Sequence, residues 1–210
     1  MQKINTGLTL ANQPGNRFPD FLYLDIKGIP VQTQQQNKGL FGGLFNFQSQ
    51  SEQTQTIEEI DLYLTLKFNQ QWQQLVNGSF KFGLRGGKLE LQLQNGIMPD
   101  YESQLNLPQI STQGSMTKPI WNFRAITSQA ILNGAVDNVK LGTVKVSTLP
   151  CHVRAIFTIS LGDLAITDSE GLWSSEISHN KLAVLERLVF LRILEPKLTP
   201  HLSLVNLHYE

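Results

Sequence analysis

Apolar and polar residues alternate along much of this chain, which is the pattern of β-strands with one buried and one solvent-facing side. The clearest case is the stretch 57–68, where five large apolar residues occupy every second position: Ile60, Leu62, Leu64, Leu66 and Phe68. The same period of two recurs at 21–27, 80–93, 120–126, 130–136, 139–146, 152–161 and 202–209. We therefore expect roughly eight to ten short strands joined by turns, which is typical of an antiparallel sandwich or barrel.

The stretch 80–93 predicts a β-hairpin, because two alternating halves flank the pair Gly86-Gly87. Glycine tolerates the positive φ angles of the two-residue turns that suit hairpins. Pairing across this turn places Leu84 opposite Leu89 and brings the large apolar side chains of both halves to one face. These side chains are Phe80, Phe82, Leu84, Leu89, Leu91 and Leu93.

One long stretch, 179–195, predicts a helix instead. Its apolar residues form two stripes at helical spacing, one of Leu182, Leu185, Val189 and Ile193 and one of Val184, Leu188 and Leu191. A helix that is apolar nearly all round is normally covered on more than one side. We expect it to lie on a β-sheet with a second cover over its back. Ser178 or Asn180 is the expected N-cap, and Glu195-Pro196 the expected end, since the residue before proline avoids helical angles.

These patterns together predict a mainly β fold. We expect an antiparallel β-sandwich or a barrel-like curved sheet, with one C-terminal helix (about 179–195) packed on it and a closing strand. At 210 residues the chain fits a single β-rich domain, 1–210. The segment 31–57 is expected to be a Gln-rich flexible loop insertion within that domain. Its polar side chains would bury too little apolar surface to offset the conformational entropy lost on ordering.

Large apolar side chains stand in the middle of this Gln-rich segment, within 39–47. They are expensive to expose, so we expect them to be buried somewhere. Either they fold back onto their own domain, or they dock into a groove of a partner or second subunit. We predict the second as the binding function of the chain. The predicted binding residues are Leu40, Phe41, Leu44, Phe45 and Phe47.

The charge balance excludes some partners. Lys and Arg number 17, as do Asp and Glu, so the formal net charge is zero. We expect no nucleic-acid binding, since phosphate contacts need an excess of basic residues. No apolar run is long enough for a membrane-spanning helix, and we expect no transmembrane segment. A single cysteine and no visible secretory signal predict a cytoplasmic protein.

No catalytic or cofactor motif is specific enough to assign. Cys151 and His152 are adjacent, and neighbours in a strand point to opposite faces, so a buried structural cysteine is the preferred interpretation. The four histidines lack zinc spacing, and we predict neither a metal site nor a cofactor. Asp163, Asp168 and Glu170 cluster without the spacing of a calcium loop, and solvated turn residues are the simpler interpretation.

The segments 141–155 and 168–173 together resemble an uncharacterised protein family of cyanobacteria. This resemblance covers the C-terminal third and implies a bacterial cytoplasm but no activity. The order of strands, helix and last strand is also similar to that of lipocalin-like barrels, as an architectural analogy only.

The sequence therefore predicts a non-enzymatic binding or scaffold module that docks a protein partner, or a second copy of itself, through the apolar loop 39–47. One alternative is a carrier that holds an apolar small molecule in a barrel or half-barrel. A second alternative is a hydrolase whose site is assembled from separate strands. That site would need at least two of six residues in one cleft: Asp163, Asp168, Glu170, His152, His179 and His201.

Overall fold

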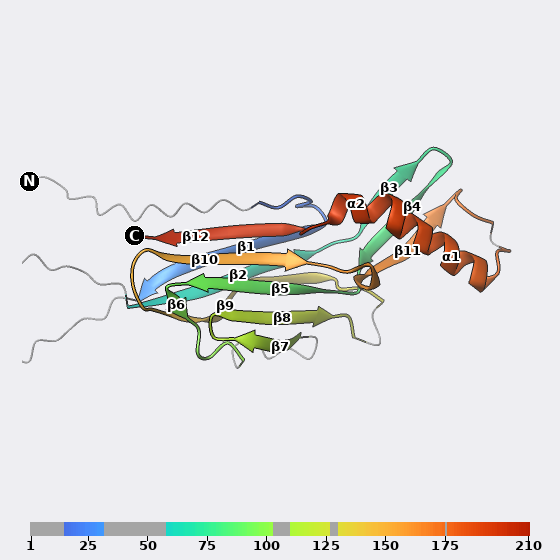
Figure 1. The fold of residues 1–210 in the computed structure, drawn as a ribbon. Coiled ribbons are helices and arrows are strands. Elements are labelled where there is room, and N and C mark those ends of the chain that lie inside the picture. Colours follow the sequence, from blue (N-terminus) through green and yellow to red (C-terminus); the bar gives the residue numbers. More distant parts are fainter. Residues whose placement is uncertain (1–14, 32–57, 103–109, 127–129, 175) are drawn as a thin grey trace, which may run out of the picture.

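The computed structural model describes residues 15–31, 58–102, 110–126, 130–174 and 176–210, and its strands form three antiparallel sheets (Figure 1). The first sheet has the order β1-β2-β9-β6, with bounds Leu22–Val31, Glu59–Phe68, Gly134–Val146 and Gly96–Ile97. The second has the order β12-β10-β5-β8-β7, with bounds Ser203–Tyr209, Cys151–Thr158, Gly86–Gln94, Lys118–Arg124 and Ile110–Ser115. The third has the order β11-β4-β3, with bounds Leu164–Glu170, Gly78–Leu84 and Gln71–Leu75. The sheets do not close into a barrel, so the sandwich prediction is confirmed.

The first two sheets pack face to face. Phe68 of β2 lies 5.8 Å from Phe123 of β8 and 5.9 Å from Phe157 of β10, measured between ring centroids. The alternation in β2 is borne out, because all five of its predicted inward residues are buried. Aromatic pairs at these distances add to the hydrophobic contribution of the core. The buried residues of all three sheets form one hydrophobic cluster.

The third sheet extends from one end of the sandwich (Figure 1). Here the predicted hairpin at 80–93 is wrong. β4 pairs with β3 and β11, whereas β5 pairs with β10 and β8. The chain turns from one sheet into another at Arg85, whose backbone bonds to Asp163 and Ala125. Gly86 and Gly87 are needed for close packing, because a Cβ on Gly86 would meet Asp163 at 2.7 Å and one on Gly87 would overlap the Phe157 ring.

Two other expectations about strands need correction. The stretches predicted as separate strands at 130–136 and 139–146 contribute to one long strand, β9, which shifts register twice against β2. Asn138 has a positive φ of 50° within it, so a local irregularity took the place of the predicted break. β3 and β7 were not predicted, because their polar sequences lack a clear alternation of apolar residues.

The helix spans α1, His179–Val189, then a π-helical turn, Phe190–Leu194, and α2, Glu195–Leu198. Ser178 is the N-cap residue, as predicted. The predicted end at Glu195-Pro196 is wrong, because the π turn lets Pro196 begin a new helical segment, where its missing N–H costs nothing. The helix ends at Thr199, whose backbone N–H and hydroxyl both donate to the Glu195 carbonyl.

The helix runs out from the same end of the sandwich as the third sheet (Figure 1). Leu194 and Leu198 are buried, and Lys197 Nζ donates to Gln73 Oε1 of β3 at 2.7 Å. Val189, Phe190 and Ile193 pack partly against the core. The contacts between the helix and the core are concentrated in the second half of the helix. The first half projects beyond them.

Candidate binding surfaces

The first half of the helix exposes apolar side chains. Val184, Leu185 and Leu188 are 60%, 36% and 46% exposed, and they form what we call the outer stripe. No residue of α1 is buried in the described part of the chain. The predicted second cover is not present among the described residues, and one candidate for it, the loop 39–47, lies outside them. Exposed apolar side chains grouped on one helix are a feature of many interaction sites.

Basic side chains border the outer stripe. Lys181, Arg187 and Arg192 are exposed on the same helix, whereas Glu186 is half-buried. A surface with an apolar centre and a charged rim is the arrangement found in protein–protein interfaces. The rim favours a neutral or acidic partner segment over a basic one.

The third sheet presents a separate face away from the helix. Trp72 of β3 is 40% exposed and pairs with Lys81 of β4. Gln73, one residue further, contacts Lys197 of the helix, so Trp72 points to the opposite side of the sheet. Trp121 by contrast is fully buried in the core.

The predicted binding residues of the loop, Leu40, Phe41, Leu44, Phe45 and Phe47, lie outside the described residues. The structure nevertheless describes the two strand ends that flank this loop. β1 ends at Val31 and β2 begins at Glu59, and these two residues pair with each other. Both lie at the end of the sandwich opposite α1 (Figure 1).

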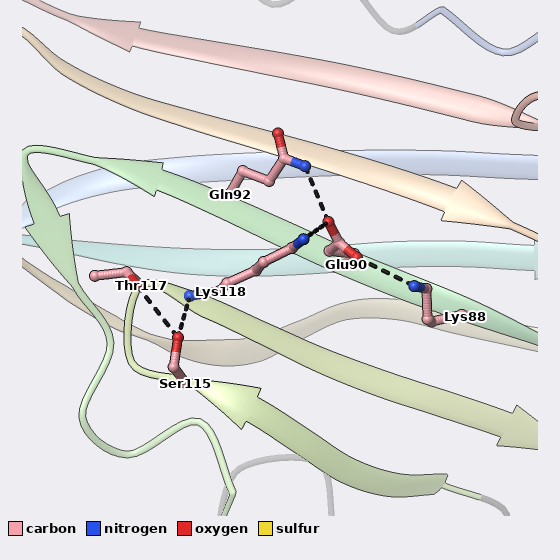
Figure 2. A network of polar contacts seen from close by, with 6 residues as sticks. All are labelled: Lys88, Glu90, Gln92, Ser115, Thr117 and Lys118. Atoms are coloured by element: carbon pink, nitrogen blue, oxygen red, sulfur yellow. Dashed lines mark hydrogen bonds and ion pairs between the residues drawn. The ribbon is translucent and has the colours of Figure 1, made fainter.

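Figure 2 shows a polar network on the outer side of the second sheet. Glu90 Oε2 accepts from Lys88 Nζ at 3.1 Å, and Glu90 Oε1 accepts from Lys118 Nζ at 3.0 Å and Gln92 Nε2 at 2.9 Å. Burial by itself would raise the pKa of Glu90, but bonds from Gln92, Lys118 and Lys88 outweigh it and lower the pKa to about 2. A carboxylate held so firmly ionised is a weak base at neutral pH, so we assign it a structural role.

Cys151 and His152 lie on opposite faces of β10, as expected. Cys151 is buried opposite Tyr209, while His152 is half-buried opposite His208. Burial raises the pKa of the Cys151 thiol, which keeps it in the unreactive protonated form.

The residues proposed for a hydrolase are not brought together. In the described chain none of the six forms a hydrogen bond with another. Asp163 accepts from the backbone and hydroxyl of Ser160, both at 2.7 Å, and Asp168 accepts from the backbone of Ser169 at 2.8 Å. The contacts of Asp163 are local turn contacts, in line with the predicted interpretation. For Asp168 and Glu170 that interpretation is wrong, because both are exposed residues of β11 that pair with β4. The carrier alternative stays a prediction.

The pair formed by His152 and His208 is the contact that sequence reasoning missed. Their Nδ1 atoms are 2.8 Å apart, although 56 positions separate the residues. The sequence pattern places both histidines on solvent-facing sides of strands. Only the pairing of β10 with β12 makes them neighbours.

Comparisons with known proteins add no family to this description. The chain matches no protein-family model, no curated protein and no solved structure. The resemblance of its C-terminal third to a cyanobacterial family therefore stays a prediction. Within the described residues, no helix is long and apolar enough to cross a bilayer. No group of three or more His, Cys, Asp and Glu side chains there could hold a metal ion.

Proposed function

We propose that this chain is a non-enzymatic scaffold module that assembles head to tail: the apolar loop 39–47 of one copy docks on the outer stripe of another. The exposed stripe of Val184, Leu185 and Leu188 carries this proposal. A helix whose apolar face has no cover within its own described chain is a suitable receptor for an apolar segment. The single cysteine supports a reducing, cytoplasmic setting for such a module.

The length of the loop does not by itself favour either the same chain or a second copy. Fourteen peptide steps separate Phe45 from Val31 and from Glu59, and a fully extended chain covers about 3.3–3.6 Å per residue, or ~50 Å. The ten residues of β1 span only ~30 Å. Sedimentation separates the two arrangements, because docking within one chain leaves the protein monomeric.

The energetics support a weak, concentration-dependent assembly. The five apolar side chains of the loop and the three of the stripe would each contribute about 1.5–3 kcal/mol if fully buried. Association costs about 4–15 kcal/mol, and ordering the loop adds to that cost. These costs offset much of the gain from burial. A contact between two different surfaces does not close on itself in a pair, so it gives rings or open chains.

Sedimentation velocity over a range of protein concentrations tests the proposal. We expect the parent chain to form assemblies as concentration rises. Deletion of 32–55 removes the loop, and L188E removes the stripe, so each variant alone should stay monomeric. L188E should keep its thermal stability, because Leu188 is exposed. Gln113→Glu, at an exposed position of β7, adds the same charge away from the stripe and should still assemble.

Mixing the two variants gives the sharper result. The loop-deleted chain keeps a stripe, and the L188E chain keeps a loop, so together they should form one-to-one pairs and nothing larger. A parent chain that stays monomeric at all concentrations overturns the proposal, as does a mixture that fails to pair. A pair formed by L188E alone would show that the loop docks elsewhere.

A further inference from the structure

Two histidines from neighbouring strands meet on the outer side of the second sheet. His152 of β10 and His208 of β12 are paired across the antiparallel ladder, with Nδ1 atoms 2.8 Å apart. Both are half-buried, which leaves one side of the pair open to solvent. Their strand neighbours, Cys151 and Tyr209, point into the core, so the buried thiol is directed away from this pair.

The arrangement of the rings does not suit an end-on hydrogen bond. A linear N–H···N bond with this nitrogen spacing would place the ring centroids about 5 Å apart. The observed centroid distance is 4.2 Å, with an angle of 39° between the ring planes. The rings therefore partly face each other, so that their Nδ1 atoms lie side by side.

Two imidazoles that bind one ion show this kind of geometry. Metal–nitrogen bonds of about 2.0–2.1 Å at a right angle put the nitrogens ~2.9 Å and the centroids ~4.5 Å apart. Tetrahedral angles would instead need a nitrogen spacing of ~3.3 Å. The observed 2.8 Å and 4.2 Å are closer to the right-angled case, which is the preference of Cu²⁺ and Ni²⁺.

Glu210 prepares His208 for this role. Its Oε1 lies 3.0 Å from Nε2 of His208, the nitrogen that faces away from His152. A carboxylate there accepts the Nε2–H and directs the proton to that side, which leaves Nδ1 with a free lone pair. A metal-bound histidine commonly donates its other ring N–H to a carboxylate in the same way.

We propose that His152 and His208 form a two-nitrogen chelate for a divalent transition-metal ion of the Cu²⁺ or Ni²⁺ type, with Glu210 as the positioning residue. The ion would lie between the two Nδ1 atoms and bind both of them. Water completes its coordination, since no third protein ligand converges there among the described residues. Arg154 is exposed on the same face, two residues along β10, and its positive charge disfavours binding of a cation. The negative charge of the Glu210 carboxylate offsets this repulsion.

Such an ion would join β10 to β12 near the end of the last strand. An ion that binds only the folded chain stabilises it in proportion to the logarithm of ion concentration. The proposal therefore has two readouts: the nitrogen ligands seen by the metal and the unfolding temperature of the protein.

The test uses the full chain with any affinity tag removed. Electron paramagnetic resonance with one equivalent of Cu²⁺ should show coupling to two imidazole nitrogens, and titration calorimetry with Ni²⁺ should give one site. His152→Ala and His208→Ala should each lose the two-nitrogen signature and weaken binding at least about tenfold. The double variant His179→Ala/His201→Ala is the control and should bind as the parent does. Glu210→Gln should keep two nitrogens but bind about 10–100-fold more weakly.

Thermal unfolding distinguishes variants that lose the metal site from variants that do not fold. In EDTA the pair variants should unfold cooperatively near the parent temperature, and Ni²⁺ should raise that temperature in the parent only. If His208→Ala does not fold, His208→Gln replaces it. Binding that is unchanged in the pair variants, or that is lost in the control, overturns the proposal. So does a parent spectrum with fewer than two imidazoles.

Discussion

Neutralising Glu90 should lower stability in a way that depends on pH. Glu90→Gln keeps the shape of the side chain but removes the charge that Lys88 and Lys118 share (Figure 2). The Glu90 side chain is only 11% exposed, so water cannot readily replace these contacts. The variant leaves two ammonium groups close together without their counter-charge, which is unfavourable in a partly buried site.

The size of the effect follows from the pKa of Glu90. A fall from 4.5 to about 2 corresponds to about 3 kcal/mol of stability as an upper bound. The lysines are 39% and 53% exposed, so solvent screens part of the interaction, and we expect about 1–3 kcal/mol at pH 7. Because the folded-state pKa is the lower one, this stability is complete above about pH 4.5 and is lost as the pH falls toward about 2.

Urea unfolding of parent and variant at several pH values measures this difference. The free energies of unfolding should differ most at pH 7, by a smaller amount near pH 3, and least near pH 2, where the parent carboxyl also takes up a proton. Glu176→Gln, at an exposed position, is the control and should change stability by less than about 0.5 kcal/mol. A difference between parent and Glu90→Gln that stays constant from pH 7 to pH 2 would refute the reasoning.

Four further outcomes follow from burial. The Tyr209 hydroxyl is buried without a hydrogen-bond partner in the described chain, so Tyr209→Phe should raise the free energy of unfolding by about 1 kcal/mol in urea titrations. A Cβ on Gly28 would overlap that hydroxyl, so Gly28→Ala should cost about 1–3 kcal/mol, and Tyr209→Phe should relieve part of it in a double-mutant cycle. Leu194→Ala should cost about 2–5 kcal/mol and Leu188→Ala less than about 0.5 kcal/mol by the same assay, since only Leu194 is buried. A thiol reagent should modify Cys151 far more slowly in the native chain than in urea, because burial raises the pKa of its thiol; equal rates would contradict the structure.

The alternation of residue types was enough to predict which side chains of β2 turn inward. Strict alternation in β2 predicted its five buried side chains, because a pleated strand sends successive residues to opposite faces. The same rule separated Cys151 from His152. Helical spacing and two N-cap candidates, Ser178 and Asn180, predicted where the helix starts, and Ser178 is the N-cap residue. These are local relations between near neighbours, and local sequence is enough to define them.

Which distant segments lie side by side became known only from the tertiary structure. The halves of 80–93 each alternate as predicted, yet they belong to different sheets, because alternation defines a face and leaves the neighbouring strand open. The all-round apolar helix was expected to be covered twice, but hydropathy does not specify which element provides the cover. His152 and His208 became a pair only when β12 aligned with β10, since register is a property of two strands together.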